Sequence, residues 1–188
     1  MPKNIAIFAS GSGSNAENII QYFKKSKEFS FPLIISNKAD AYVHQRAKNL
    51  NVKSVSFRKQ DFETGEEILD LLHKFKIDAI VLAGFLLKVP ESIINAYPDQ
   101  IINIHPALLP KFGGKGMYGN HVHKAVRASG DTETGITIHF VNKRYDDGNI
   151  IFQAKCTVEP HDSYEDIARK VHELEYEHFP KVIEMIFG

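Results

Sequence analysis

The sequence of 188 residues contains a single cysteine, and neither sign of charge is in excess. One cysteine, Cys156, excludes an internal disulfide framework and a cysteine-based zinc site, and it fits a reducing compartment. Lysine plus arginine total 23, and aspartate plus glutamate also total 23. No net charge is therefore available to attract nucleic acid or a membrane surface, and we expect small-molecule partners.

Long apolar runs are absent as well. No segment approaches the roughly 18 continuous apolar residues of a membrane-spanning helix, and residues 1–4 lack the layout of a signal peptide. We therefore expect a cytoplasmic protein. The chain has 43% hydrophobic and 24% charged residues, with no linker-like tract or internal repeat, so a single domain over residues 1–188 is predicted.

What is present is a regular alternation of strand and helix patterns. The expected strands cover residues 5–9, 31–36, 52–57 and 78–83, and the expected helices cover residues 16–25, 39–50 and 63–75. This order predicts a mostly parallel α/β sheet with right-handed crossovers. Further on, residues 135–141 and 150–158 are expected to form an antiparallel hairpin at the sheet edge. Asp162 or Ser163 then begins a long terminal helix.

A glycine- and serine-rich loop, residues 10–15, follows the first predicted strand directly. Such a loop before a helix can cradle a phosphate, because glycine allows close approach and the first helical N–H groups are free. It formally matches a dinucleotide-binding fingerprint ending at Ala16, but the expected acid after the second strand is missing. A tight turn without a ligand is the third interpretation. We favour a monophosphate cradle.

The segment from Ile101 to Pro110 ends an apolar run with two polar residues. Side chains alternate along a strand, so Asn103 and His105 should share one face while Ile102 and Ile104 take the other. Pro106 should end the strand, which places the amide and the imidazole at a carboxyl end, where open α/β sheets bind ligands. The alternative is a buried polar pair bonded to backbone.

Five motifs occur in one order along the chain: residues 10–15, 36–41, 82–85, 103–110 and 146–148. Together they resemble the folate-dependent formyltransferase family, in its phosphoribosylglycinamide formyltransferase branch, over essentially the whole chain. The resemblance implies a Rossmann-like fold and transfer of a formyl group from 10-formyltetrahydrofolate to the amine of 5'-phosphoribosylglycinamide in purine biosynthesis. It implies the folate as co-substrate, no tightly bound cofactor and no metal.

The resemblance also implies a set of site residues. The catalytic residues would be Asn103, His105 and Asp146. The ribonucleotide would be bound by Gly13, Ser14, Asn15 and Glu175, and the folate by Leu86, Leu87, Lys88, Val89, Asn103, Val141 and Asn142. Amine attack on a formyl carbon makes an oxyanion, which a neutral amide donor and an imidazole raised in pKa by a nearby carboxylate could stabilise. The resemblance also divides the chain into a phosphate-binding half, about residues 1–100, and a folate and catalytic half, about residues 101–188.

Several alternatives stay open at this stage. Asp147 competes with Asp146 for the carboxylate role, and Glu175 could be a solvated helix charge beside Glu173. Lys88 could supply the charge of an arginine that the family often carries nearby, and residues 113–119 exceed the usual short turn. Rival classes are a dinucleotide-dependent oxidoreductase and a binding module without catalysis; the protein would be a monomer or a homodimer.

Overall fold

The computed structural model describes residues 1–188 and contains seven strands and seven helices. In chain order they are β1 Lys3–Phe8, α1 Ser14–Tyr22, β2 Phe29–Ser36, α2 Val43–Asn49, β3 Lys53–Ser56, α3 Asp61–Thr64, α4 Glu66–Lys74, β4 Ala79–Leu82, α5 Glu91–Ala96, β5 Ile101–His105, α6 Asn120–Ser129, β6 Glu133–Phe140, β7 Ile150–Thr157 and α7 Tyr164–Phe187.

All seven strands form one sheet, in the order β3-β2-β1-β4-β5-β6-β7. The first five strands run parallel, whereas β6 pairs antiparallel with both β5 and β7. The predicted α/β class and antiparallel C-terminal hairpin are confirmed. The strand order reverses between β1 and β4, and such a switch point leaves a crevice at the carboxyl ends of the strands.

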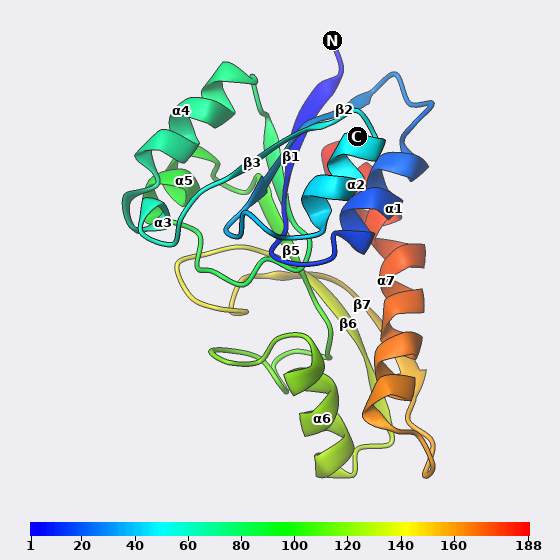
Figure 1. The fold of residues 1–188 in the computed structure, drawn as a ribbon. Coiled ribbons are helices and arrows are strands. Elements are labelled where there is room, and N and C mark those ends of the chain that lie inside the picture. The colour runs from blue at the N-terminus through cyan, green and yellow to red at the C-terminus, as the bar shows by residue number, and fades with distance from the viewer.

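Two apolar layers cover the two faces of the sheet. Alternate residues of β1 divide between them, because successive side chains of a strand point to opposite faces: Ile5 and Ile7 enter one layer, and Ala6 and Phe8 the other. The larger layer packs α1, α2, α6 and α7 against the sheet, and the smaller one packs α3, α4 and α5. Figure 1 shows α7 running along the molecule from the α6 end to the α1 and α2 end.

The predicted helix over residues 63–75 is two helices, α3 and α4, separated by Gly65. Gly65 has φ 74°, and a Cβ at this position would lie 2.8 Å from Pro90 Cβ. The break is therefore set by a close tertiary contact that the helical pattern does not reveal. The helix predicted from residue 39 begins only at Val43. At the start of α7, Ser163 is the N-cap and forms a capping box with Asp166.

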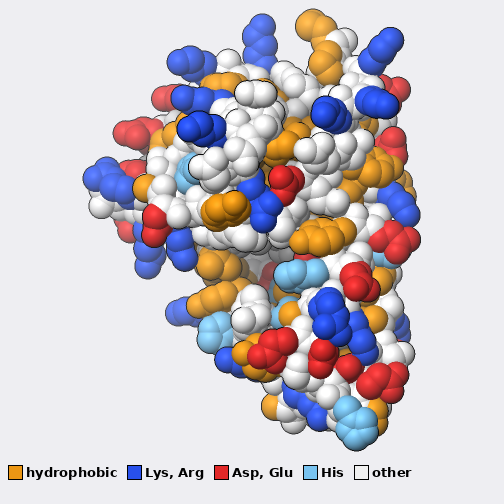
Figure 2. All heavy atoms as spheres, turned by 45° about the vertical axis from the view of Figure 1, so that its right-hand side comes forward, with side chains coloured by type: hydrophobic (Ala, Val, Ile, Leu, Met, Phe, Trp, Pro, Cys, Tyr) orange, Lys and Arg blue, Asp and Glu red, His pale blue; other side chains and the backbone are white.

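The surface carries charges of both signs. Acidic and basic side chains are interspersed over the face in Figure 2, with no large area of one sign. None of the helices combines the length and the apolar composition needed to cross a bilayer.

Candidate active site

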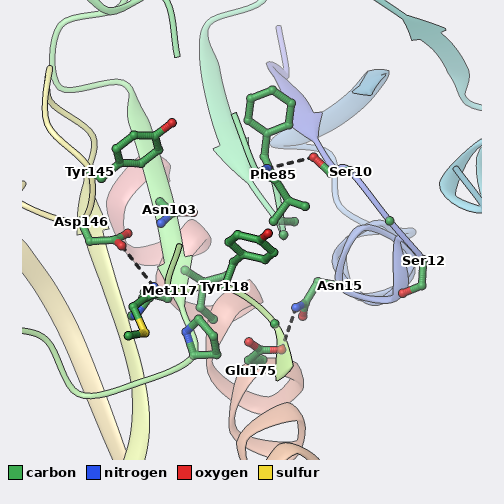
Figure 3. Close-up of a pocket in the computed structure, with 18 of the residues that line it drawn as sticks. Ser10, Ser12, Asn15, Phe85, Asn103, Met117, Tyr118, Tyr145, Asp146 and Glu175 are labelled. Carbon is green, nitrogen blue, oxygen red and sulfur yellow. Dashed lines mark hydrogen bonds and ion pairs between the residues drawn. The ribbon is translucent and has the colours of Figure 1, made fainter. Parts of the chain in front are cut away.

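A cavity of about 650 Å³ opens at the carboxyl ends of the central strands. Its wall is made by the loop after β1, the loop after β4, the end of β5, the glycine-rich segment before α6, and α7. In Figure 3, Asn103, Asp146 and Tyr145 lie on one side of this cavity, and Asn15 and Glu175 lie on the other. Segments from both ends of the chain thus meet at the switch point of the sheet.

Asn103, His105 and Asp146 are brought together, as the sequence predicts. Asn103 and His105 share one face of β5, while Ile102 and Ile104 enter the larger apolar layer. The turn after β6 brings Asp146 over the strand end, so that its Oδ2 lies 3.5 Å from His105 Nδ1. Asp146 Oδ2 also accepts a hydrogen bond of 2.9 Å from the Gly114 N–H.

His105 is nearly fully buried, with 3% of its surface exposed. Its Nε2 lies 2.7 Å from the carbonyl oxygen of Phe112. Because a carbonyl only accepts, Nε2 carries the proton in the neutral ring. Burial lowers the pKa of His105, and the attraction of Asp146 does not fully compensate. The sequence-based expectation of a raised pKa is wrong, because desolvation outweighs the carboxylate.

Asp146 is ionised in this arrangement. Burial acts to raise the pKa of Asp146, but the neighbouring His105 and the Gly114 N–H act against burial, and the pKa is lowered. A carboxylate beside a neutral imidazole can stabilise a second proton on His105 Nδ1 when the reaction supplies one. In the structure as a whole, no group of three or more His, Cys, Asp or Glu side chains is arranged to hold a metal ion.

The loop after β1 lines the cavity through residues 10–15. Gly13 has φ 73° and directly precedes α1, whose first-turn N–H groups have no acceptor within the helix. A Cβ at Gly13 would lie 2.9 Å from the Cα of Val43, so α2 packs too closely for any other residue. Ser10 joins two loops: its Oγ lies 2.5 Å from Asn37 Oδ1 and accepts from the Leu86 N–H at 2.9 Å.

Glu175 is buried at 6% exposure, so it is not a solvated helix charge. Its carboxylate accepts a hydrogen bond of 2.9 Å from Asn15 Nδ2, which joins α7 to the start of α1 beside the cavity. Burial raises the pKa of Glu175, against the lowering effects of His172 and of the Asn15 hydrogen bond. His123, on α6, lines the same wall of the cavity.

All the predicted folate residues except Leu86 line a second pocket next to the main cavity. Leu87, Lys88 and Val89 come from the loop after β4, and Val141 and Asn142 follow β6. Asn103 and Asp146 line both pockets, so the two spaces meet at the β5 end. Leu86 lies on the main cavity side. Lys88 is exposed, whereas Val89 is buried.

Several lining residues are not identified by the sequence patterns. His139 and Tyr145 line the second pocket, and Lys38, Tyr118 and His123 line the main cavity. For His139 a signal existed, because the alternation in residues 135–141 placed it on the polar face of its strand. What the pattern could not give is the register that sets His139 opposite Asn103. Lys38 lies within the motif of residues 36–41, but that motif alone assigns it no role. Tyr118, His123 and Tyr145 lie in loops or on a helix and carry no local pattern.

Comparisons with known proteins agree with this site. A family model described as formyl transferase matches residues 3–183. The phosphoribosylglycinamide formyltransferase of Bacillus subtilis is 34% identical over 191 residues, covering 99% of this chain and 95% of the relative. Its chloroplastic counterpart in Arabidopsis thaliana is 38% identical, but the chain spans only 64% of that relative, and 61% of the one from Vigna unguiculata.

Solved structures extend the likeness to three dimensions. Glycinamide ribonucleotide transformylase 1 from Geobacillus kaustophilus superposes with a TM-score of 0.91 at 33% identity, over 100% of both chains. Phosphoribosylglycinamide formyltransferase from Streptococcus pneumoniae gives 0.87 at 35% identity. Fold and site thus define an α/β protein with an amide, an imidazole and a carboxylate at a sheet switch point. The chain belongs to the formyl transferase family, among relatives named phosphoribosylglycinamide formyltransferase.

Proposed function

We propose that this chain transfers the formyl group of 10-formyltetrahydrofolate to the amine of 5'-phosphoribosylglycinamide, a step of purine biosynthesis. The observation that carries the proposal is the position of Asn103, His105 and Asp146 at the junction of two pockets. One pocket contains a glycine-rich loop at a helix start, and the other combines apolar side chains such as Leu87 and Val89 with polar ones such as Asn142. This layout suits one phosphorylated and one flat aromatic substrate, with the reacting atoms meeting between them.

In the proposed reaction the substrate amine attacks the formyl carbon and forms a tetrahedral oxyanion. The Asn103 amide donates to the developing negative charge without itself changing charge. Collapse of the intermediate breaks the bond from the carbon to N10 of the folate. The attacking nitrogen loses one proton and N10 gains one, so the proton count balances.

His105 and Asp146 are assigned to this proton exchange. His105 Nδ1 faces the Asp146 carboxylate at 3.5 Å, so a proton on Nδ1 is stabilised as an ion pair. Its Nε2 faces the Phe112 carbonyl at 2.7 Å. Donation from Nε2 to a substrate therefore requires the segment from Phe112 to Gly119 to withdraw. Asp146, through water, accepts the proton that the amine loses.

In the proposed complex, each substrate occupies one of the two pockets. The ribonucleotide phosphate lies on the loop of Gly13, Ser14 and Asn15, and Glu175 accepts from the ribonucleotide near its glycinamide end. The folate ring lies against Leu86, Leu87 and Val89, with Val141 and Asn142 reading its polar edge. Lys88 lies at the rim of the second pocket, where it can attract the carboxylates of the folate tail.

The proposal also covers the domain organisation, the compartment and the partners of the enzyme. A single domain comprises a phosphate-binding half, residues 1–100, and a folate and catalytic half, residues 101–188, which are joined by one continuous sheet. The enzyme works in the cytoplasm on small-molecule substrates, without nucleic acid or membrane, as a monomer or homodimer.

The decisive experiment is formyl transfer by purified protein, with each substrate omitted in turn. Formylated ribonucleotide that forms only when both substrates are present supports the proposal. Folate deformylation without the ribonucleotide would instead assign the chain a hydrolase activity. Folate binding with no product would mean that the acceptor amine is a different one, and the proposed reaction would be wrong.

A further inference from the structure

A second histidine lies within the catalytic group and has no role in the steps above. His139 is on β6, directly opposite Asn103 in the antiparallel pairing of β5 and β6. Only 2% of its surface is exposed, and it lines the second pocket beside Asn103 and Asp146. A buried imidazole at this position needs hydrogen-bond partners for both ring nitrogens.

The partners of His139 define its protonation. Nδ1 lies 2.8 Å from the Phe140 carbonyl, which can only accept, so Nδ1 carries the proton. Nε2 then has a lone pair, and it lies 3.1 Å from Asn103 Nδ2, which donates to it. Asp146 Oδ1 is 3.7 Å from the same Nε2, too far for a hydrogen bond.

The surrounding backbone holds His139 in this orientation. At Gly148, in the turn after β6, a Cβ would lie 1.6 Å from the Phe140 oxygen and 3.5 Å from His139 Nδ1. The turn therefore closes directly over the carbonyl that fixes the ring. The pairing between β6 and β7 also shifts register between Ile138 and His139, as a bulge does where a strand re-aims a side chain.

We propose that His139 is a positioning residue for formyl transfer: by accepting from Nδ2 it fixes the Asn103 amide with its nitrogen edge, not its oxygen, toward the reacting carbonyl. An amide turned by 180° would present an acceptor to the oxyanion and would repel it. One Nδ2 hydrogen is held by His139, and the second is free to donate to the oxyanion. The inference rests on the proposed function and adds a residue that acts through Asn103.

The test measures steady-state rates for wild type, His139→Leu, Asn103→Ala and the double variant. We expect His139→Leu to lower kcat by about 10- to 100-fold, with both KM values within about 3-fold of wild type. This is less than the roughly 100- to 1,000-fold cost of removing an oxyanion donor, because the Asn103 amide is still present and only its orientation is lost. In the Asn103→Ala background, the same substitution should have little further effect, because the group that His139 orients is gone. His139→Gln, which keeps an acceptor, should recover part of the rate.

Thr134→Val is the matched control, because Thr134 is also buried on β6 and its hydroxyl has no partner. Its kcat should equal that of wild type. If His139→Leu lowers the rate equally with and without Asn103, His139 acts only on general structure and the proposal is wrong. Full kcat in His139→Leu would overturn it as well.

A readout independent of turnover separates this proposal from the assigned reaction. Nitrogen-15 NMR of the histidine rings should show His139 protonated at Nδ1 and hydrogen-bonded at Nε2, with Nε2 shifting in Asn103→Ala. A proton on Nε2 would overturn the inference even in an active enzyme. If the wild-type protein shows this NMR pattern but does not transfer the formyl group, the assigned reaction is wrong. The role of His139 in that reaction is then wrong as well, and only its hydrogen bond with Asn103 stands.

Discussion

At the scale of single residues, burial decides what each polar group of the site can do. His105 and Asp146 form a close pair, yet the pKa values of both are lowered, so the resting pair is a neutral imidazole beside a carboxylate. The family motif identifies these side chains but contains no information on desolvation. In the proposed reaction, such a pair would take up a proton only when the tetrahedral intermediate forms, which suits transient proton transfer.

Glu175 gives a prediction at this scale. Glu175→Gln keeps the shape and an acceptor oxygen but removes the negative charge. A charge-assisted hydrogen bond is worth about 1.5–3 kcal/mol, so the KM for the ribonucleotide should rise about 10-fold or more at pH 8, with a smaller change in kcat. Because burial raises the pKa of Glu175, the wild-type carboxyl takes up a proton at a higher pH than an exposed glutamate does. The difference between wild type and variant should therefore shrink at pH 6.

Glu173→Gln is the control, because Glu173 is exposed on the same helix. Its KM should match that of wild type at both pH values. An unchanged KM in Glu175→Gln at pH 8 would show that this carboxylate does not bind the ribonucleotide, and that it serves only to join α7 to Asn15.

At the scale of elements, the backbone of the segment between β5 and α6 contacts His105 and Asp146, the proposed catalytic pair. Phe112, Gly114, Gly116 and Gly119 all have positive φ values. Through its carbonyl and N–H groups, this segment contacts both His105 and Asp146. Its glycines permit a backbone path that most residues cannot follow.

Gly114→Ala should therefore impair turnover. Gly114 has φ 91°, and although a Cβ would meet nothing within 4 Å, the conformation is strained for alanine. Relief of that strain would displace the N–H that bonds Asp146. We expect kcat to fall about 10-fold or more, since small misplacements of catalytic groups are costly.

The matched control is Gly130→Ala, at the C-terminal end of α6. Gly130 has φ 74° and the same free space, but it is exposed and outside both pockets. It should lose about 1 kcal/mol of stability in urea unfolding and keep the wild-type kcat. Equal kcat values for the two variants would show that the glycine-rich segment does not position Asp146.

At the scale of the whole molecule, sequence patterns predicted the sheet better than the contacts across it. Alternation and apolar runs were sufficient to place β1 to β7. Five of these strands bury their apolar side chains, whereas β3 and β7 at the two sheet edges contain no fully buried residue. The break at Gly65 depends on Pro90, 25 positions away, and the pairing of His139 with Asn103 depends on strand register. Such contacts between distant residues leave no local signal, so the sequence predicted the catalytic group only in part.

The burial of several ionisable side chains also couples the fold to pH. His123, on α6, is 1% exposed, and burial, with His172 and His105 nearby, lowers its pKa to about 4. The unfolded chain binds this proton at about pH 6.5, so His123 favours folding above pH 6.5, and the contribution is lost as pH falls toward 4. His105 acts with the same sign. Glu175, whose pKa is raised, acts oppositely, because its folded form holds a proton more tightly.

His123→Asn should consequently flatten the dependence of stability on pH. From the two pKa values, wild type should lose about 2 kcal/mol at His123 between pH 7 and pH 5, and the variant should not. The free energy of unfolding in urea at pH 5, 6 and 7 measures this difference. The slope of that free energy against pH is compared between wild type and variant, because the substitution also changes packing and so shifts the absolute values. His161→Asn, at an exposed histidine, should keep the wild-type slope. A wild-type slope in His123→Asn as well would show that another buried group, such as His105, sets the acid limit of the fold.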